Sequence, residues 1–80
     1  MLTELRLPEA GMGITEGTIL KWNKAAGEKV SAGEVLVEVE TAKAVTEVPS
    51  PVDGVLQEIL FPEGTTAEVN ATLAVLRTDF

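Results

Sequence analysis

The sequence predicts an all-β fold, a flattened barrel or sandwich of two four-stranded sheets related by a pseudo-twofold internal repeat. Short apolar stretches are separated by glycine or proline about every eight to twelve residues, without a sustained helical period, and this spacing is typical of strands. A shift of 37 positions lays Gly17 on Gly54 and Gly27 on Gly64. Two copies of one strand and turn unit can cover each other's apolar faces.

The repeat covers residues 17–39 and 54–76, and apolar positions recur with the turns. Gly33 falls on Asn70, which is the replacement expected where the backbone needs a left-handed conformation. The segment 40–44 lies at the junction of the two copies. We therefore expect one domain over residues 1–80 with a hairpin at 40–44.

The remaining apolar and turn signals place the strands. In the segment 35–40 valines alternate with Leu36, Glu38 and Glu40, as in a strand with one face on a core. The strands expected are 2–7, 17–22, 29–30, 35–40, 44–48, 54–60, 66–67 and 73–77. Glycine and proline predict turns at 11–13, 26–27, 32–33, 49–54 and 63–64.

The composition excludes several classes of function. The chain has no cysteine and no histidine, so disulfides, zinc clusters and Ser-His or Cys-His catalysis are absent, and we predict no catalytic residue and no metal ligand. The net charge is −7 and the six basic residues are scattered, which argues against nucleic acid. Without a secretion signal or a long apolar run, we expect no membrane and a cytoplasmic location, or the mitochondrial matrix in a eukaryote.

The junction between the copies carries the candidate functional residue. A tight link between two strands leaves its central side chains in solvent, so Lys43 is expected at the tip of a hairpin. No Asn-Gly or Asp-Gly occurs there, which favours a type I turn over the primed types. From geometry alone, an ordinary solvated lysine is the simpler interpretation.

The neighbourhood of this lysine resembles the lipoylation segment of lipoyl domains. The family pattern is Glu-Thr-Asp-Lys-Ala, and this chain has Glu40-Thr41-Ala42-Lys43-Ala44 followed by a proline-flanked turn that ends in Asp53-Gly54. The resemblance covers essentially the whole chain. Further positions that match the family are Pro8, Glu16-Gly17, Trp22, Gly27, Val30, Gly33, Leu36, Glu63-Gly64 and Leu73-Ala74.

The resemblance implies that a lipoate ligase or lipoyl transferase joins lipoic acid to the Lys43 amine by an amide bond, which removes the lysine charge. It also implies that the residues around the lysine define the target of that enzyme. Ala42 departs from the family's usual Asp, which puts the partner in question more than the modification. The residues implied in recognition are Glu40, Thr41, Ala42, Ala44, and Gly27 and Gly54, which match glycines that shape turns near the hairpin.

The resemblance further implies a domain of a dihydrolipoamide acyltransferase (E2) in a 2-oxo acid dehydrogenase complex. A thiamine-diphosphate decarboxylase (E1) would reductively acylate the dithiolane, the acyltransferase core would pass the acyl group to coenzyme A, and dihydrolipoamide dehydrogenase (E3) would reoxidise the dithiol. The isolated domain would be a monomeric, non-catalytic carrier. We expect it to be the N-terminal portion of a longer acyltransferase chain.

Partner docking is expected at the hairpin tip and the loop 8–15, which the family holds close to it. The residues proposed for docking are Glu9, Met12, Ile14 and Thr15. For Ile14, core burial is an equal alternative, and for Trp22 core burial is favoured because it lies in the middle of a strand.

Other functions remain open at this stage. A biotinyl domain has the same architecture, but its lysine is typically flanked by methionines, whereas Lys43 lies between alanines. The glycine-cleavage carrier is longer and has added helices. An enzyme would need paired carboxylates, which nothing in the sequence organises around a pocket, and an unmodified β-module is the structural alternative. The identity of the 2-oxo acid is also open.

Overall fold

The computed structural model describes residues 1–9 and 11–78, which form strands joined by turns and loops. All eight predicted strands are present, with ends that differ by at most one residue from the prediction, so the all-β prediction is confirmed. Within the described residues no helix is long and apolar enough to cross a membrane. The strands are β1 (Leu2–Arg6), β2 (Glu16–Trp22), β3 (Lys29–Val30), β4 (Val35–Glu40), β5 (Val45–Pro49), β6 (Gly54–Ile59), β7 (Thr66–Glu68) and β8 (Thr72–Arg77).

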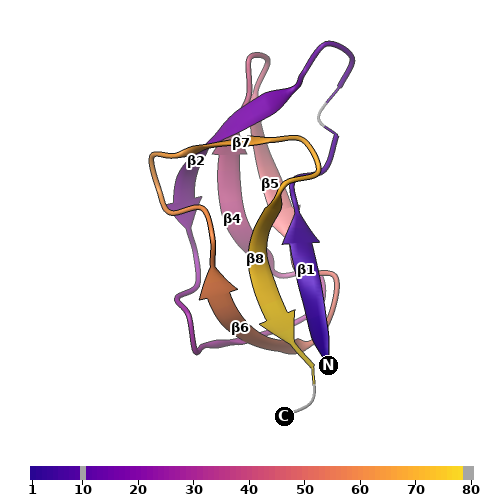
Figure 1. Cartoon of the computed structure of the whole chain (residues 1–80), viewed down its shortest axis with the longest axis vertical. Helices are drawn as coiled ribbons and strands as arrows, with labels where there is room; N and C mark the ends of the chain where they lie inside the picture. The colour runs from indigo at the N-terminus through magenta and orange to yellow at the C-terminus, as the bar shows by residue number, and fades with distance from the viewer. Residues whose placement is uncertain (10, 79–80) are drawn as a thin grey trace.

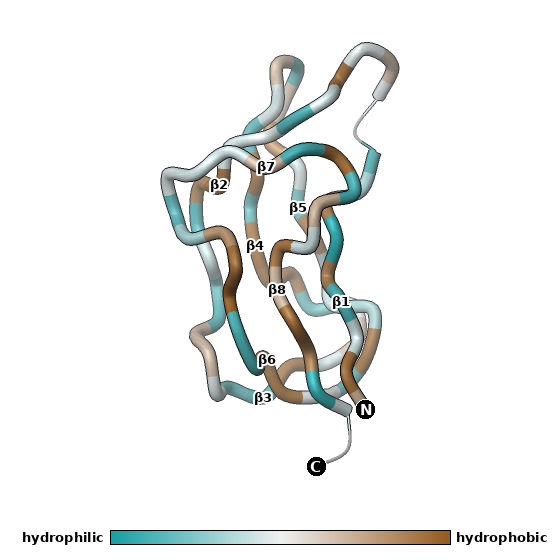
Figure 2. The backbone as a smooth tube through the Cα atoms, in the orientation of Figure 1, coloured by the Kyte–Doolittle hydropathy of each residue, from teal (hydrophilic) through white to brown (hydrophobic). Residues whose placement is uncertain are grey.

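The strands form two four-stranded antiparallel sheets, with the orders β1-β8-β6-β3 and β5-β4-β2-β7. We call them sheet A and sheet B. β3 pairs with β6 and β7 pairs with β2, so each half of the sequence gives a short strand to the sheet of the other half (Figures 1 and 2). The sheets are not closed into a barrel. The molecule is a flattened sandwich of 38 × 21 × 17 Å.

The predicted repeat holds at the level of single hydrogen bonds. The Gly27 amide donates to the Leu56 carbonyl at 2.6 Å, and 37 positions on, the Gly64 amide donates to the Ile19 carbonyl at 2.8 Å. Asn70 has a φ of 72° and the equivalent Gly33 has a φ of 87°. Both residues therefore have the left-handed conformation that the repeat predicted. The two sheets are therefore related by a pseudo-twofold axis, as expected.

The core lies between the sheets and draws on both halves. Its apolar residues run along the middle of the strands, as the hydropathy of β8 shows in Figure 2. Each fully buried leucine or isoleucine contributes roughly 1.5–3 kcal/mol relative to exposure. The largest buried side chains are Leu7, Ile19, Leu36, Leu56, Leu73, Leu76, Val37 and Val39.

Trp22 is the last residue of β2 and is half-buried against this core, so it lies neither in the middle of a strand nor fully in the core as expected. Its indole nitrogen donates a hydrogen bond to the Phe61 carbonyl at 2.9 Å. Its backbone amide donates to the Glu63 carboxylate at 2.9 Å. Because residues 61 and 63 lie between β6 and β7, the tryptophan ties the two sheets together.

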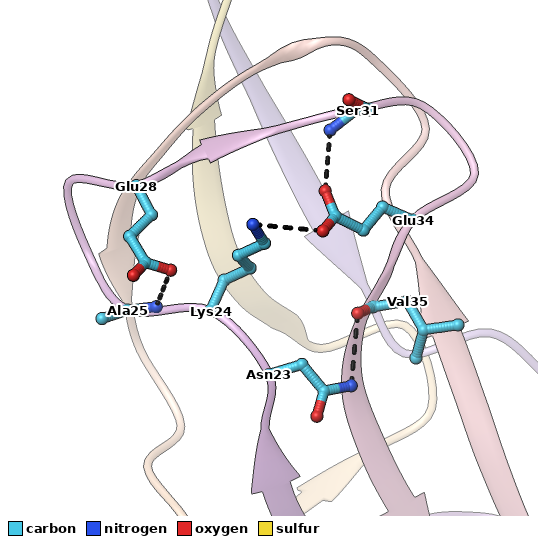
Figure 3. Close-up of polar contacts among 7 residues, drawn as sticks. All are labelled: Asn23, Lys24, Ala25, Glu28, Ser31, Glu34 and Val35. Atoms are coloured by element: carbon cyan, nitrogen blue, oxygen red, sulfur yellow. Dashed lines mark hydrogen bonds and ion pairs between the residues drawn. The ribbon is translucent and has the colours of Figure 1, made fainter.

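Carboxylates shape the loop between β2 and β4, which is shown in Figure 3. Glu28 accepts a hydrogen bond from the Ala25 amide at 3.1 Å, and Glu34 accepts one from the Ser31 amide at 3.0 Å. Glu34 also pairs with the Lys24 ammonium at 3.1 Å. The Ser31 hydrogen bond, followed by Lys24, lowers the pKa of Glu34, so this support of the loop is lost as the pH falls through that lowered pKa.

Alanine substitution of Gly17 or Gly54 is expected to destabilise the fold. A Cβ on Gly17 would lie 2.4 Å from the buried Val39 side chain, and one on Gly54 would lie 2.4 Å from the Arg77 carbonyl oxygen. Each variant should lose about 2–3 kcal/mol in urea unfolding, because a packed core resists added volume. Gly64→Ala is the control, with open space around the added Cβ but a φ of 88°, and should lose only about 1 kcal/mol. Equal losses in all three would contradict the packing argument.

Candidate functional site

The junction hairpin projects from one end of the long axis of the molecule. Glu40 and Val45 form the last pair of the β4–β5 ladder, and residues 41–44 link them. Lys43 is exposed at the tip, as predicted, and Met1 and Thr78, the first and last described residues, meet at the opposite end. The start of the chain is marked N in Figure 1. No ion pair joins Lys43 to any of the described residues, so its amine is open to solvent and to reagents.

The side chain of Thr41 closes the turn. The Thr41 amide donates to the Ala44 carbonyl at 2.9 Å, and the Thr41 hydroxyl donates to the same oxygen at 2.9 Å. The hydroxyl oxygen also accepts from the amides of Lys43 at 3.4 Å and Ala44 at 3.3 Å. In a regular β-turn of residues 41–44, the Thr41 carbonyl would accept a hydrogen bond from the Ala44 amide. Here the Thr41 hydroxyl oxygen accepts that hydrogen bond in place of the carbonyl. Ala42 and Lys43 lack positive φ, in agreement with the exclusion of primed turns.

The same threonine geometry recurs at the other end of the molecule. The Thr78 amide donates to the Met1 carbonyl at 3.0 Å, and the Thr78 hydroxyl approaches that oxygen at 3.3 Å. Thr78 lies 37 positions after Thr41, so the meeting point of the chain ends is the pseudo-twofold equivalent of the lysine hairpin. The fold therefore places the termini and Lys43 at equivalent but opposite points.

A groove separates the hairpin from the loop that precedes β2. It has a volume of about 260 Å³, and residues 13–18 form one wall while Glu40, Thr41 and Ala42 form the other. Ile14 and Thr15 line it, which confirms that this loop lies beside the hairpin. Ile14 is half-buried and lies outside the main core, so neither full burial nor full exposure describes it.

The other docking candidates are on the same loop. Met12 is 92% exposed and Glu9 is exposed. The loop is held by a hydrogen bond from the Ile14 amide to the Gly11 carbonyl at 3.2 Å. Residue 10 of the proposed docking loop lies outside the described residues. The loop and the hairpin rise at the same end of the molecule (Figure 1).

The expectation that Gly27 and Gly54 shape turns near the hairpin is wrong. Gly54 packs against Arg77 and Thr78, and Gly27 donates to Leu56 in sheet A, so both belong to the end with the termini. The glycine beside the hairpin is Gly17, whose missing Cβ leaves room for Val39, Glu40 and Thr41. The internal repeat could have identified this glycine from the sequence, because Gly17 is the equivalent of Gly54 in the other half.

The described residues hold no candidate metal site. No group of three or more acidic side chains there is arranged to hold a metal ion. A depression of about 770 Å³ lies beside Trp22 and Ile59 in the middle of the molecule, away from the hairpin. The site residues Glu40, Thr41, Ala42, Lys43 and Ala44 are thus brought together on one turn, and the structure adds Gly17 and the groove.

Comparisons with known proteins agree on the family. The profile of the Biotin_lipoyl family, described as "Biotin-requiring enzyme", matches residues 3–76. Among solved structures, the lipoyl domain of the 2-oxoglutarate dehydrogenase complex from Azotobacter vinelandii is 36% identical with a TM-score of 0.77, and the match covers 94% of this chain and 95% of that one. A long-chain acyl-CoA carboxylase shares the fold with a TM-score of 0.80 at 22% identity, over 99% of this chain and 7% of that one.

Curated relatives are components of larger enzymes. The succinyltransferase component of a 2-oxoglutarate dehydrogenase complex from Bartonella vinsonii subsp. berkhoffii is 53% identical over 95% of this chain and 18% of its own length. The acetyltransferase component of a pyruvate dehydrogenase complex from Corynebacterium glutamicum is 49% identical over 90% of this chain and 11% of its own length. The chain therefore spans less than a fifth of the length of these relatives.

Replacing Thr41 with valine should loosen the hairpin. The change keeps the β-branched shape and removes only the hydroxyl, which leaves the Lys43 and Ala44 amides without their acceptor. We expect a loss of about 1 kcal/mol and at least fivefold faster amide hydrogen exchange at residues 43 and 44. NMR exchange measures this. Thr41→Ser should restore protection, and Thr78→Val should leave it unchanged; faster exchange in the Thr78 variant would refute the local argument.

Proposed function

The chain belongs to the Biotin_lipoyl family, as a lipoyl domain, and on that premise we propose that Lys43 carries lipoic acid in amide linkage. The modified side chain would act as a swinging arm between active sites of a 2-oxo acid dehydrogenase complex. The observation that carries the proposal is the exposed Lys43 amine at the tip of a two-stranded hairpin. A carrier needs its attachment atom in this position, clear of the fold that supports it.

The residues around the amine fit a lipoyl group. Ala42 and Ala44 have no bulk or charge beside the lysine, and Thr41 fixes the backbone that carries it. The Lys43 ammonium would first lose a proton, and the neutral amine would then displace the activating group from the carboxyl carbon of lipoic acid and lose a second proton. The lysine charge would thus be replaced by a neutral amide. Since no described residue pairs with that charge, its loss costs the fold nothing.

The bound lipoyl group supplies a dithiolane that accepts electrons and an acyl group, and the protein supplies presentation. The hairpin holds the attachment point at one end of a molecule 38 Å long, with the chain termini at the other. A tether leaving from the termini would therefore leave the arm end free. Tethering of this kind raises the effective concentration of the arm at its target to the order of millimolar.

The proposed partners follow from this assignment. They are a lipoate ligase or lipoyl transferase that modifies Lys43, a thiamine-diphosphate decarboxylase (E1), the acyltransferase core of the same chain (E2) and dihydrolipoamide dehydrogenase (E3). The named relatives act with two different 2-oxo acids, so the proposal covers the class of complex and no single acid. Weak docking with a small buried area suits a domain that must leave each partner quickly.

Biotin is the second candidate group, because the family description itself includes biotin-requiring enzymes. The carboxylase structure shares only the fold with this chain. Two observations argue against biotin. Lys43 is flanked by alanines in place of methionines, and the chain is 36% identical to a lipoyl domain over 95% of that domain. The same experiment separates the two groups.

Co-expression with a lipoate ligase in the presence of lipoic acid should add the mass of one lipoyl group to the protein. Lys43→Arg should abolish the gain, because arginine cannot form the amide, while Lys21→Arg, on the same sheet, should keep it. Intact-mass spectrometry gives the result. A gain equal to biotin in a host with an active biotin ligase would favour the second candidate, and no gain with either competent ligase would reject the carrier function.

Ala42→Asp restores the acidic residue that the family usually has before the lysine. We expect the lipoylation rate to stay within about threefold, because Ala42 is exposed and the turn is fixed by Thr41. Reductive acylation by a given decarboxylase should instead change by about fivefold or more, because a charge next to the arm alters docking. Ala44→Asp is the matched control on the other side of Lys43. If Ala42→Asp blocks lipoylation but leaves reductive acylation of the modified fraction unchanged, residue 42 acts in ligase recognition and not in decarboxylase docking, and the prediction is wrong.

A further inference from the structure

The charges of the two sheets differ sharply although their folds are equivalent. The strands of sheet A carry two carboxylates and three cations, a net charge of +1. The strands of sheet B carry five carboxylates and one cation, a net charge of −4. The carboxylates of sheet B are Glu16, Glu38, Glu40, Glu47 and Glu68.

These carboxylates lie on the outer face of sheet B. Their strand neighbours Gly17, Val39, Val48 and Ala67 are buried, so alternation turns the acidic side chains outward. The Thr18 and Thr66 hydroxyls meet at 3.3 Å on the same face.

The face is continuous with the end of the molecule that carries Lys43. Glu40 closes the hairpin ladder opposite Val45, and on its other side it pairs with Thr18 of β2. Glu16 and Glu40 both line the groove beside the hairpin. Val45, which is 51% exposed, adds an apolar contact at the rim. A protein that receives the Lys43 arm must therefore come close to this face.

The arrangement costs stability. Glu16 is directly opposite Glu68, and Glu38 is directly opposite Glu47 on one side and Lys21 on the other. Like charges in direct cross-strand pairs destabilise a sheet. No ion pair joins these four side chains to any described residue.

The fold does not require the like-charge pairs, as its own second copy shows, although the equivalent of Glu16 there is Asp53, which is also acidic and accepts a hydrogen bond from the Ala32 amide at 2.8 Å. The equivalent of Glu38 in sheet A is Val75, that of Glu68 is Ser31, and that of Glu40 is Arg77. Glu4 lies opposite Val75 as Glu47 lies opposite Glu38, so Glu4 takes the place of Glu47 in sheet A. Glu4 is paired with Arg6 at 2.6 Å, and the Thr72 and Arg6 hydrogen bonds lower the pKa of Glu4. Sheet A thus avoids both like-charge pairs. Since the fold can avoid these destabilising pairs, their presence in sheet B is expected to serve function.

We propose that the outer face of sheet B is a docking surface for a positively charged protein surface at the entrance of the decarboxylase active site that receives the Lys43 arm. This proposal rests on the proposed function. Charge complementarity identifies the partner, because an unpaired acidic face next to the arm attracts a basic one and steers it toward the entrance. Weak, salt-sensitive attraction also permits rapid release. Sheet A, with the opposite net charge, would face away.

The test replaces two carboxylates with the residues that the other sheet carries, in the double variant Glu38→Val/Glu68→Ser. Glu40 is left in place because it is also a candidate for ligase recognition. A second variant adds Ser31→Glu and Gln57→Glu, both exposed and on the sheet A side, which restores the net charge of −7. Each protein is lipoylated, and complete modification is verified by intact mass. The probe is the decarboxylase that acylates the unmutated lipoylated domain.

We expect kcat/KM for reductive acylation to fall about tenfold in both variants at low ionic strength, with the difference shrinking toward about 0.15 M salt. The urea midpoint of the double variant should equal or exceed that of the unmutated chain, because one carboxylate of each like-charge pair is gone. Recovery of kcat/KM in the charge-restored variant would show that net charge matters rather than this face, and would overturn the proposal. So would unchanged kcat/KM in the double variant. Failure of the unmutated chain to become lipoylated would instead reject the proposed function.

Discussion

The structure depends on the exchange of short strands between two equivalent halves. The Ile19 amide donates to the Thr65 carbonyl within sheet B, and the Leu56 amide donates to the Glu28 carbonyl within sheet A, so the two halves of the sequence are joined by the same hydrogen bond on both sides of the pseudo-twofold axis. A two-residue strand such as β3 would not be stable alone, and here it is held by β6. Because neither half can complete its sheet without the other, the core forms as one unit, and the hairpin between the halves has a rigid base.

That rigid base explains how an eight-stranded domain can present a single amine. The β4–β5 ladder carries the hairpin to the end of the molecule, and the Thr41 hydroxyl replaces the backbone carbonyl that would normally close the turn. The same construction appears as an open end where Thr78 meets Met1. One symmetric fold thus yields one attachment point and one pair of termini, separated by the length of the molecule, which suits a tethered arm.

Symmetry also separates what the fold requires from what the function requires. Features present in both halves, such as the glycines at 17 and 54 and the bulges after Ile19 and Leu56, serve packing and sheet twist. Features present in one half alone, such as Lys43 and the acidic face of sheet B, have no counterpart that the fold needs. This distinction assigns Gly54 to the architecture, although its family resemblance had placed it near the lysine.

The sequence by itself determined the eight strands, the internal repeat and the exposed lysine at its junction, because alternation, turn glycines and a regular spacing are local properties of the chain. The family resemblance added the lipoyl assignment through Glu40-Thr41-Ala42-Lys43-Ala44. Only the tertiary structure decided which strands exchange, that Gly17 rather than Gly54 supports the hairpin, and that residues 13–18 form a groove with the turn. These features depend on contacts between segments far apart in the chain, and local patterns do not encode which distant partner a strand edge or a loop will meet.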